Sequence, residues 1–469
     1  MELTGLETAV LSEKLAAGEV SAVEVMKATL GRIEQVNGSV NAIVSLRAEK
    51  DLLKEAEAAD AAKPEGWLHG IPIAIKDLAD AAGLPTSQGS PLFADVAAAR
   101  DSTVTARLRA AGAIVIGKTN TPEFGLGSHT FNPVHGATRN PYDTTRSAGG
   151  SSGGAAAALA CGMLTVADGS DMMGSLRNPA AWNNVYGMRP SWGLVPGDPD
   201  GDLYLHPLST NGPMARTPRD LAALLDVMAG PDAGRPLGRI ADPARPGIDD
   251  APEGLRGAWL GDWDGALPFE DGVLETCKAA LPQMRKIGWS IEDIGAPFDA
   301  DALWRSWTTL RSFSVANTLG EIYDDPLQRE KLKPSARWEA ERGRALSGVE
   351  IQAASLTRSD WYRCAASLFE RFDVLIAPSA QVWPFPVEDE YPVRIAGREM
   401  DTYHRWMEVV IPASLIGLPV VAIPVGFGRQ GLPMGAQLIG RPGSDAWLLR
   451  AAQAWHAATG WPQKRPAMV

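Results

Sequence analysis

The first part of the chain repeats apolar and polar positions with the period of a helix. Two patterns, Thr4-Gly-Leu-Glu7 and Ser21-Ala-Val-Glu24, each place a hydroxyl three residues before a carboxylate. Such a capping box satisfies the free N–H groups at the start of a helix. After the second pattern, one helical face carries Met26, Leu30 and Ile33. We therefore predict a helical N-terminal region over about residues 1–65.

From Gly70 onward, short apolar runs alternate with helical patterns. The runs at 71–76 and 113–116 predict strands, and 102–111 predicts a capped helix between them. Near the C-terminus, 419–424 and 434–439 predict a pair of strands, followed by a helix from Ser444 to Thr459 that Gly460 closes. This alternation is typical of an α/β sheet protein.

The middle of the chain, about residues 230–400, has a weaker period and several proline-rich joints, which indicates a variable region. No internal repeat, low-complexity tract or clear linker divides the 469 residues. We therefore expect residues 1–469 to form a single domain.

Composition and charge exclude several classes of protein. The chain has 44 Lys and Arg residues against 56 Asp and Glu residues, a net charge of −12, which would repel a phosphate backbone. Apolar runs fall short of the ~18 residues of a membrane span, and no signal-like stretch follows Met1. The three cysteines lack the spacing of a disulfide framework or a zinc site. We expect a cytoplasmic protein without a metal.

Two familiar motifs occur in the wrong context. Gly112-Ala-Ile-Val-Ile-Gly117-Lys118-Thr119 matches the pattern of a phosphate-binding loop, but its central residues are an apolar β-branched run that predicts a strand. Gly149-Gly-Ser151-Ser-Gly153 matches a hydrolase nucleophile elbow, which needs a strand before it. The preceding residues 140–147 look like a polar turn, and His456, the one histidine late enough for the usual triad, lies in an amphipathic helix.

A third combination supplies the groups that amide hydrolysis needs. The reaction requires a nucleophile, a base that later protonates the leaving nitrogen, and donors for the oxyanion. Lys76 ends an apolar run, where burial could keep it neutral and basic, although a simple ion pair with Asp77 is the alternative. Ser151 lies in a glycine-rich loop and Ser175 at a turn after Gly174, where successive N–H groups could converge.

With these segments in place, the chain resembles the amidase signature family over nearly its whole length. The resemblance rests on five landmarks in the family's order: His69-Gly-Ile-Pro-Ile-Ala-Ile-Lys-Asp77, Gly117-Lys-Thr-Asn-Thr-Pro-Glu-Phe124, Gly149-Gly-Ser-Ser-Gly-Gly154, 171–179, and Gly431-Leu-Pro-Met-Gly-Ala-Gln-Leu-Ile-Gly440. It implies a large mixed β-sheet covered by helices on both faces. It also implies that about residues 230–400 form the substrate funnel.

The resemblance assigns a role to each candidate residue. Ser175 would be the acylated nucleophile, Ser151 a bridging serine after a cis peptide bond, and Lys76 the base. Backbone N–H groups of the same turn would form the oxyanion hole, and three further side chains would support the site. The first set is Met172, Met173, Gly174 and Ser175, and the second is Ser152, Asp171 and Arg177.

The chain departs from the family pattern at one position, because Met173 stands where the family has the first of two glycines. This substitution changes the expected shape of the acyl pocket. By analogy, Gly125 and Gly127 would border the scissile carbonyl. Several tryptophans of the variable region either pack in the core or contact substrate; they are Trp304, Trp307, Trp361, Trp383 and Trp406.

The sequence therefore predicts an amidase that hydrolyses a carbon–nitrogen bond of a small-molecule amide through a Ser175 acyl-enzyme. Esters and carbamates are open as substrates, because one oxyanion hole serves all three. The alternatives are an amidotransferase A-type subunit of a larger complex and a catalytically inactive binding protein on the same fold. We expect no cofactor, no nucleic acid and no membrane as partners, and the chain could form a homodimer.

Overall fold

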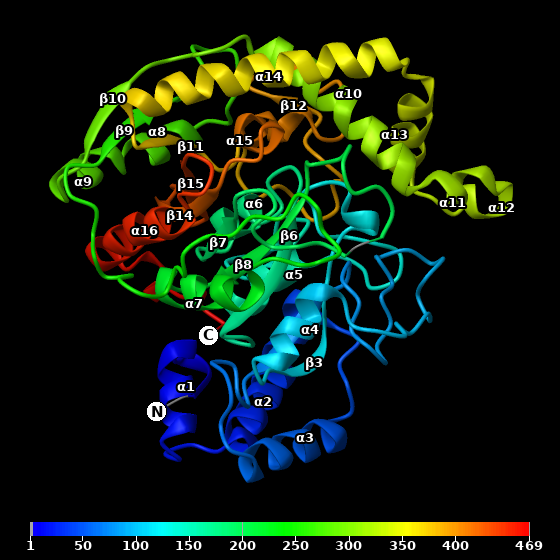
Figure 1. Ribbon diagram of the computed structural model, residues 1–469, viewed down its shortest axis with the longest axis vertical. Coiled ribbons are helices and arrows are strands. Elements are labelled where there is room, and N and C mark those ends of the chain that lie inside the picture. The colour runs from blue at the N-terminus through cyan, green and yellow to red at the C-terminus, as the bar shows by residue number, and fades with distance from the viewer. Residues whose placement is uncertain (1–2, 199, 469) are drawn as a thin grey trace.

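The computed structural model describes residues 3–198 and 200–468 and has an eight-stranded mixed sheet at its centre (Figure 1). Its order is β10-β9-β11-β15-β14-β7-β8-β6. The first three strands run parallel, and every later neighbour pair is antiparallel. In that order the strands are Ser290–Asp293, Arg256–Trp259, Val374–Pro378, Pro433–Ile439, Val420–Phe427, Tyr186–Arg189, Thr210–Ala215 and Val166–Asp171.

Helices cover both faces of this sheet, as the resemblance implies. In β7, Tyr186 contacts His456 of α16 (Asp445–Thr459). A Cβ on the next residue, Gly187, would lie 3.1 Å from Ala180 of α6 (Arg177–Trp182). Because successive strand residues point to opposite faces, α6 and α16 lie on opposite sides of the sheet.

The strands predicted at 71–76 and 113–116 belong to a separate three-stranded sheet. β2 (Pro72–Lys76) and β3 (Ile114–Thr119) pair in parallel, and β1 (Ile43–Val44) pairs antiparallel with β3. At the edge of the large sheet, β2 meets β6 through a side chain, because the Lys76 N–H donates to Asp168 Oδ1 at 2.9 Å. This contact brings the end of β2 beside β6, where the candidate site lies.

The N-terminal helices are α1 (Thr8–Ala16), α2 (Ala22–Val40) and α3 (Glu49–Ala61), which lie below the sheets in Figure 1. The predicted capping box at Ser21 and Glu24 is present. The one at Thr4 and Glu7 is wrong, because Thr4 lies in a short 3-10 helix and α1 begins only after Glu7. Asp220 instead accepts hydrogen bonds from the first N–H groups of α1.

The C-terminal prediction is confirmed. β14 and β15 pair antiparallel, and α16 ends at Gly460, whose φ of 58° is the left-handed conformation that glycine favours. The residues between about 230 and 400 include α14 (Gly348–Arg371), the longest helix that the structure describes. No helix in the described ranges is long and apolar enough to cross a membrane.

The remaining elements connect or cover these layers. The helices are α4 (Thr103–Ala110), α5 (Gly153–Ala160), α7 (Pro218–Met228), α8 (Val273–Lys278), α9 (Leu281–Lys286), α10 (Ala300–Thr318), α11 (Gly320–Asp324), α12 (Pro326–Arg329), α13 (Pro334–Ala345) and α15 (Ile411–Leu415). Short 3-10 helices span Leu3–Gly5, Glu123–Gly125, Arg405–Val410 and Trp461–Gln463. Two small hairpins pair β4 (Arg139–Asn140) with β5 (Asp143–Ser147), and β12 (Arg394–Ile395) with β13 (Arg398–Glu399).

Candidate active site

The side-chain nitrogen of Lys76 lies at the centre of a cluster of serines. Lys76 ends β2 and is only 1% exposed. Its Nζ lies 2.7 Å from Ser151 Oγ and 2.8 Å from Ser152 Oγ. It also lies 3.1 Å from the hydroxyl and 3.3 Å from the carbonyl oxygen of Ser170. A neutral lysine can donate two of these hydrogen bonds and accept a third, so one serine hydroxyl can donate to it.

Burial lowers the pKa of Lys76 to about 7, because it removes water from the charged form, although Asp168 and Asp171 favour the ammonium. The alternative partner from the sequence, Asp77, lies elsewhere. Asp77 Oδ1 is 3.6 Å from Lys118 Nζ, and its carboxylate accepts hydrogen bonds from Ser87. Lys76 is therefore available as a base near neutral pH.

Ser151 and Ser152 lie in the glycine-rich loop before α5. The Gly150–Ser151 peptide bond is cis, as the resemblance implies. The loop packs closely on its surroundings, since a Cβ on Gly154 would lie 2.3 Å from the backbone N of Asn120. The Ser152 N–H donates to the carbonyl oxygen of Ser175 at 3.2 Å, which joins this loop directly to the turn that carries Ser175.

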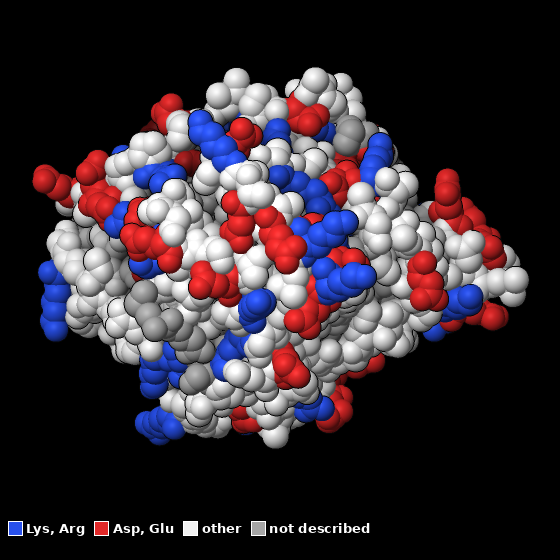
Figure 2. Space-filling view, turned by 90° about the horizontal axis from the view of Figure 1, so that it is seen from below, with Lys and Arg blue, Asp and Glu red and all other residues white. Residues whose placement is uncertain are grey.

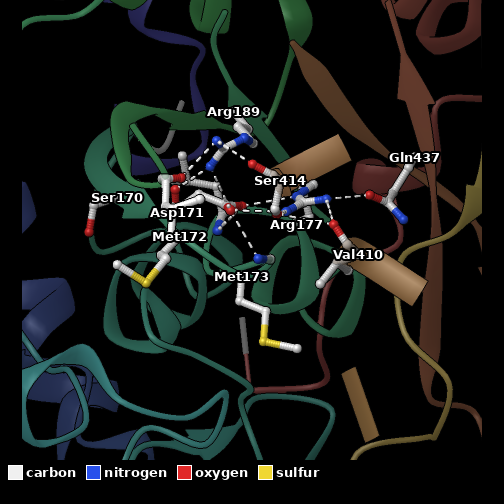
Figure 3. A network of polar contacts seen from close by, with 12 residues as sticks. Ser170, Asp171, Met172, Met173, Arg177, Arg189, Val410, Ser414 and Gln437 are labelled. Carbon is white, nitrogen blue, oxygen red and sulfur yellow. Dashed lines mark hydrogen bonds and ion pairs between the residues drawn. The ribbon is translucent and has the colours of Figure 1, made fainter. Parts of the chain in front are cut away.

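A buried carboxylate shapes that turn (Figure 3). Asp171 Oδ1 accepts a hydrogen bond from the Gly174 N–H at 2.9 Å, and Oδ2 accepts one from the Leu176 N–H at 3.1 Å. Arg177 forms two hydrogen bonds of 3.0 Å with the same carboxylate, and Arg189 lies 3.3 Å from it. Although burial favours the neutral acid, these guanidinium groups hold the pKa of Asp171 well below its usual range.

Arg177 in turn connects the turn to the rest of the sheet region. It donates to the Val410 carbonyl at 2.9 Å, to Gln437 Oε1 at 2.5 Å and to Ser414 Oγ at 2.5 Å, as Figure 3 shows. Both Asp171 and Arg177 are fully buried. The predicted supporting residues Ser152, Asp171 and Arg177 thus contact the Lys76 cluster or fix the backbone of the turn.

The turn leaves several N–H groups free beside Ser175. Gly174 has a φ of 82°, and its N–H already has a partner in Asp171. In the described residues, no acceptor is found for the N–H groups of Met172, Met173 and Ser175. Met173 does not have a positive φ, so the methionine is compatible with the backbone where the family has glycine. Its Sδ accepts a hydrogen bond from Trp307 Nε1 at 3.2 Å.

Ser151, Ser175 and both predicted glycines line one cavity of about 150 Å³. Its other walls come from Leu78, Phe124, Leu126, Ser170, Met172, Met173, Ser209, Arg311, Val315, Thr318, Leu319 and Met407. A Cβ on Gly125 would lie 3.7 Å from Ser151 Oγ, which places this glycine beside the serine. Ser175 and Ser151 are both among the described residues, and their hydroxyl groups do not form a hydrogen bond with each other.

A second cavity of about 290 Å³ shares Leu126 and Gly127 with the first. Trp406 contributes to this second cavity, but none of the five tryptophans considered from the sequence lines the cavity at Ser175. All five are buried, and Trp307 reaches the site only through Met173. The packing interpretation therefore describes them better than direct contact at Ser175.

The two competing motifs have structural roles. The P-loop-like segment forms β3, and Lys118 Nζ donates to the Ala79 carbonyl at 2.5 Å and to Thr86 Oγ1 at 3.1 Å inside the protein. The polar turn predicted before Ser151 is wrong in part, because β5 forms there through antiparallel pairing with β4. This hairpin is not part of the large sheet, and His456 contacts Tyr186 rather than Ser151.

Sequence reasoning missed three side chains of the site. Ser170 contacts Lys76. It directly precedes the 171–179 segment, and this position next to a recognised motif could have identified it from the sequence. Asp168 holds the backbone of Lys76 from β6. Arg311 reaches the cavity from α10, and nothing in its local sequence marks it.

Within the described ranges, no group of three or more His, Cys, Asp or Glu side chains could hold a metal ion. On the face in Figure 2, acidic and basic side chains are interspersed. The buried charged groups at the site include Lys76, Asp168, Arg311 and the Asp171 carboxylate with its two arginines, Arg177 and Arg189.

Comparisons with known proteins identify the family of this chain. The Amidase family model matches residues 24–449. An acylamidase of Rhodococcus erythropolis is 33% identical, over 97% of this chain and 96% of its own length. The A subunit of the glutamyl-tRNA(Gln) amidotransferase of Thermus thermophilus is 36% identical, over 95% and 96%. The crystal structure of a bacterial aryl acylamidase of the amidase signature enzymes superposes with a TM-score of 0.90, 28% identity and coverage of 98% and 99%.

The chain belongs to the amidase signature family. Family membership makes the protein an amidase-family hydrolase that acts on amide bonds. Its relatives include both an acylamidase and amidotransferase subunits.

Proposed function

We propose that this protein is a serine amidase that hydrolyses the carbon–nitrogen bond of a small amide through an acyl-enzyme on Ser175. The observation that carries the proposal is the 2.7 Å contact between Lys76 Nζ and Ser151 Oγ beside the cavity that Ser175 lines. A base with a pKa of about 7 is close to the working pH, where general base catalysis is most efficient.

In the proposed mechanism, Ser151 relays protons between Ser175 and Lys76. Ser175 Oγ attacks the carbonyl carbon and gives its proton to Ser151 Oγ, whose own proton passes to neutral Lys76. Lys76 then returns a proton through Ser151 to the leaving nitrogen, and the carbon–nitrogen bond breaks. Water attacks the resulting ester by the same path and releases the acid, which regenerates the three groups. The missing Ser175 to Ser151 hydrogen bond would form with substrate, as catalytic contacts often tighten on binding.

The free N–H groups of Met172, Met173 and Ser175 would stabilise the oxyanion, which is the largest single contribution in many acyl transfers. The Gly174 N–H, which the resemblance also assigns to this role, holds the Asp171 carboxylate and fixes the turn instead. Ser152 would orient Lys76. Gly125 and Gly127 would leave room for the substrate beside the serines.

The variable region would form the substrate entrance within a single domain of residues 1–469. Arg311, Val315 and Thr318 of α10 support this, because they line the cavity at Ser175 from inside the range 230–400.

A substrate panel tests the proposed function. The purified protein would be incubated with aryl amides, aliphatic amides, esters and carbamates, and its whole mass would be measured during turnover. We expect amide hydrolysis by the protein alone and a transient mass increase equal to the acyl group. Absence of both product and adduct across the panel would contradict the proposal.

The second candidate is an amidotransferase A-type subunit, which the 36% identical relative favours. Such a subunit would release ammonia for an acceptor only within its complex. It would show little turnover alone and would gain activity when partner subunits are added. An inactive binding protein would show neither behaviour, even though its Lys76 and Ser151 were in place.

The rate should depend on the charge of Lys76. Because the neutral base accumulates above its pKa of about 7, we expect kcat/KM for an amide to rise through that pH and to level off above it. Asp168→Asn should move the midpoint to lower pH, because the Asp168 carboxylate favours the ammonium form. A pH profile of both proteins measures this, with Asp373→Asn at a partly exposed ion pair outside the cavity as control.

An unchanged midpoint in Asp168→Asn would show that Lys76 does not control the profile. EDTA should leave the rate unchanged, and a loss that zinc restores would contradict the metal-free mechanism.

The Met173 side chain should influence which size of acyl group the enzyme prefers. Its side chain lines the cavity and is 2% exposed, so Met173→Gly would open space toward Trp307. We expect kcat/KM for bulky acyl groups to change several-fold relative to small ones, on the ~1–3 kcal/mol scale of apolar pocket contacts. The volume-conserving Met173→Leu should change the ratio much less.

The Met173→Gly variant should also unfold more easily, by about 2–5 kcal/mol, because a buried side chain is lost. Kinetics would therefore be measured below its melting transition. A uniform change for large and small acyl groups would assign Met173 to packing alone.

A further inference from the structure

The cavity at Ser175 contains a guanidinium group that the proposed mechanism does not use. Arg311 lies on α10, is 3% exposed, and is the one charged side chain among the described residues that line this cavity. A charge buried at this position is costly unless it is paired or binds a ligand.

The hydrogen bonds of Arg311 account for only part of its donors. Nε donates to Glu339 Oε1 at 2.8 Å, and Nη2 donates to the Tyr403 hydroxyl at 2.7 Å. Nη1 contacts Met172 Sδ at 3.3 Å, and a thioether is a weak acceptor. A guanidinium has five N–H groups, so two have no partner among the described residues and a third is only weakly satisfied.

The ion-pair partner of Arg311 lies outside the cavity. Glu339 is fully buried on α13 and does not line the cavity. α13 packs tightly on α10, since a Cβ on Gly343 would lie 2.1 Å from the Ser312 carbonyl oxygen. Glu339 and Gly343 are four residues apart and share this helix face. The neighbouring yellow-green helices α10 and α13 are visible in Figure 1.

The charge of Arg311 is already compensated. Glu339 forms the 2.8 Å ion pair with Arg311, and it also accepts hydrogen bonds from Ser312 Oγ at 2.5 Å and from the Tyr403 hydroxyl at 2.9 Å. A substrate carboxylate would lose its hydration without meeting a net positive charge. A neutral oxygen would lose less hydration free energy than a carboxylate. It could still accept hydrogen bonds from the free N–H groups of Arg311.

We propose that Arg311 determines specificity by donating hydrogen bonds to a second, uncharged acceptor oxygen of the substrate, such as a ketone, amide or ether oxygen. This inference rests on the proposed function and specifies its substrate class. More than half of the other residues that line the cavity are apolar, among them Leu78, Val315 and Leu319, so most of the remaining substrate surface is apolar. The substrate is an apolar amide with one further neutral oxygen.

Three anilides that differ at one position test this class. N-phenylpentanamide has no second oxygen in its acyl chain, N-phenyl-4-oxopentanamide has a ketone, and 4-anilino-4-oxobutanoate has a carboxylate. A second set would place an ether oxygen in the amine portion, as N-(2-methoxyethyl)pentanamide compared with N-butylpentanamide. We expect kcat/KM to be at least tenfold higher for the oxygen-bearing neutral member in one of the two sets.

Variants assign that preference to Arg311. Arg311→Lys keeps a positive charge beside Glu339 but removes the forked donors, so the ratio should fall to within about twofold of unity. If this variant does not fold, the double variant Arg311→Met with Glu339→Gln removes both charges together and should show the same loss. Arg344→Lys on the exposed side of α13 is the matched control and should keep the wild-type ratio.

Binding to the Ser175→Ala protein separates this inference from the proposed function. Calorimetry with the same compounds should show the preference for the neutral oxygen without any turnover, and Arg311→Lys in that background should remove it. Binding preference without hydrolysis by the wild type would overturn the proposed function alone. Equal affinities throughout, a ratio that Arg311→Lys leaves unchanged, or an Arg311-dependent preference for the carboxylate would overturn the inference.

Discussion

Ser175→Ala is expected to lower kcat by roughly 10⁴-fold or more, because no other group would form the acyl-enzyme. The variant should also lose covalent labelling by a fluorophosphonate. Its melting temperature should remain close to that of the wild type, since only one hydroxyl is removed from a cavity wall. Labelling detected by whole-protein mass, together with turnover of an aryl amide, measures the effect.

The matched control is Ser367→Ala, which removes a hydroxyl from an exposed position on α14. It should keep both labelling and turnover. Labelling that persists in Ser175→Ala and maps to Ser151 would return the nucleophile to the glycine-rich loop and support the elbow interpretation.

Arg177→Met should cause the largest loss of stability among single substitutions at the site. It removes two 3.0 Å hydrogen bonds to the buried Asp171 carboxylate and leaves Gln437 and Ser414 without their donor. Breaking a buried ion pair in this way costs about 3–5 kcal/mol. Because Asp171 fixes the Gly174 N–H, turnover should fall even below the melting transition.

Denaturant unfolding measures this effect, with Arg363→Met as its control. Arg363 also pairs with an aspartate, Asp360, but both side chains are mostly exposed, at 68% and 57%. Exposed pairs contribute about 0–1 kcal/mol, so the control should unfold almost as the wild type does. Similar losses for the two variants would show that the buried network does not stabilise the turn.

Local sequence patterns predicted the elements well where neighbouring residues decide them. The capping box at Ser21, the strand that ends at Lys76, and the Gly460 end of α16 all depend on residues within a few positions. The box at Thr4 failed because a distant residue, Asp220, supplies the acceptor that the pattern assigned to Thr4. The β5 strand escaped prediction because a polar edge hairpin has no apolar face to reveal it.

The motifs named the candidate residues, but the resemblance to a family, rather than spacing, gave them roles. Lys76 and Ser151 are 75 residues apart, and Arg177 and Gln437 are 260 apart. No periodic pattern reaches over such separations. The same resemblance assigned an oxyanion role to the Gly174 N–H, whereas the structure engages that group with Asp171.

The sequence by itself determined the α/β class, the strand that carries Lys76, the glycine-rich loop that carries Ser151 and the turn after Gly174 that carries Ser175. These are local properties of backbone preference and burial. Only the tertiary structure decided the pKa of Lys76, the N–H groups left free beside Ser175, and the approach of Arg311 from α10. Each of these depends on desolvation and on hydrogen-bond partners from distant segments, which exist only after the chain has folded.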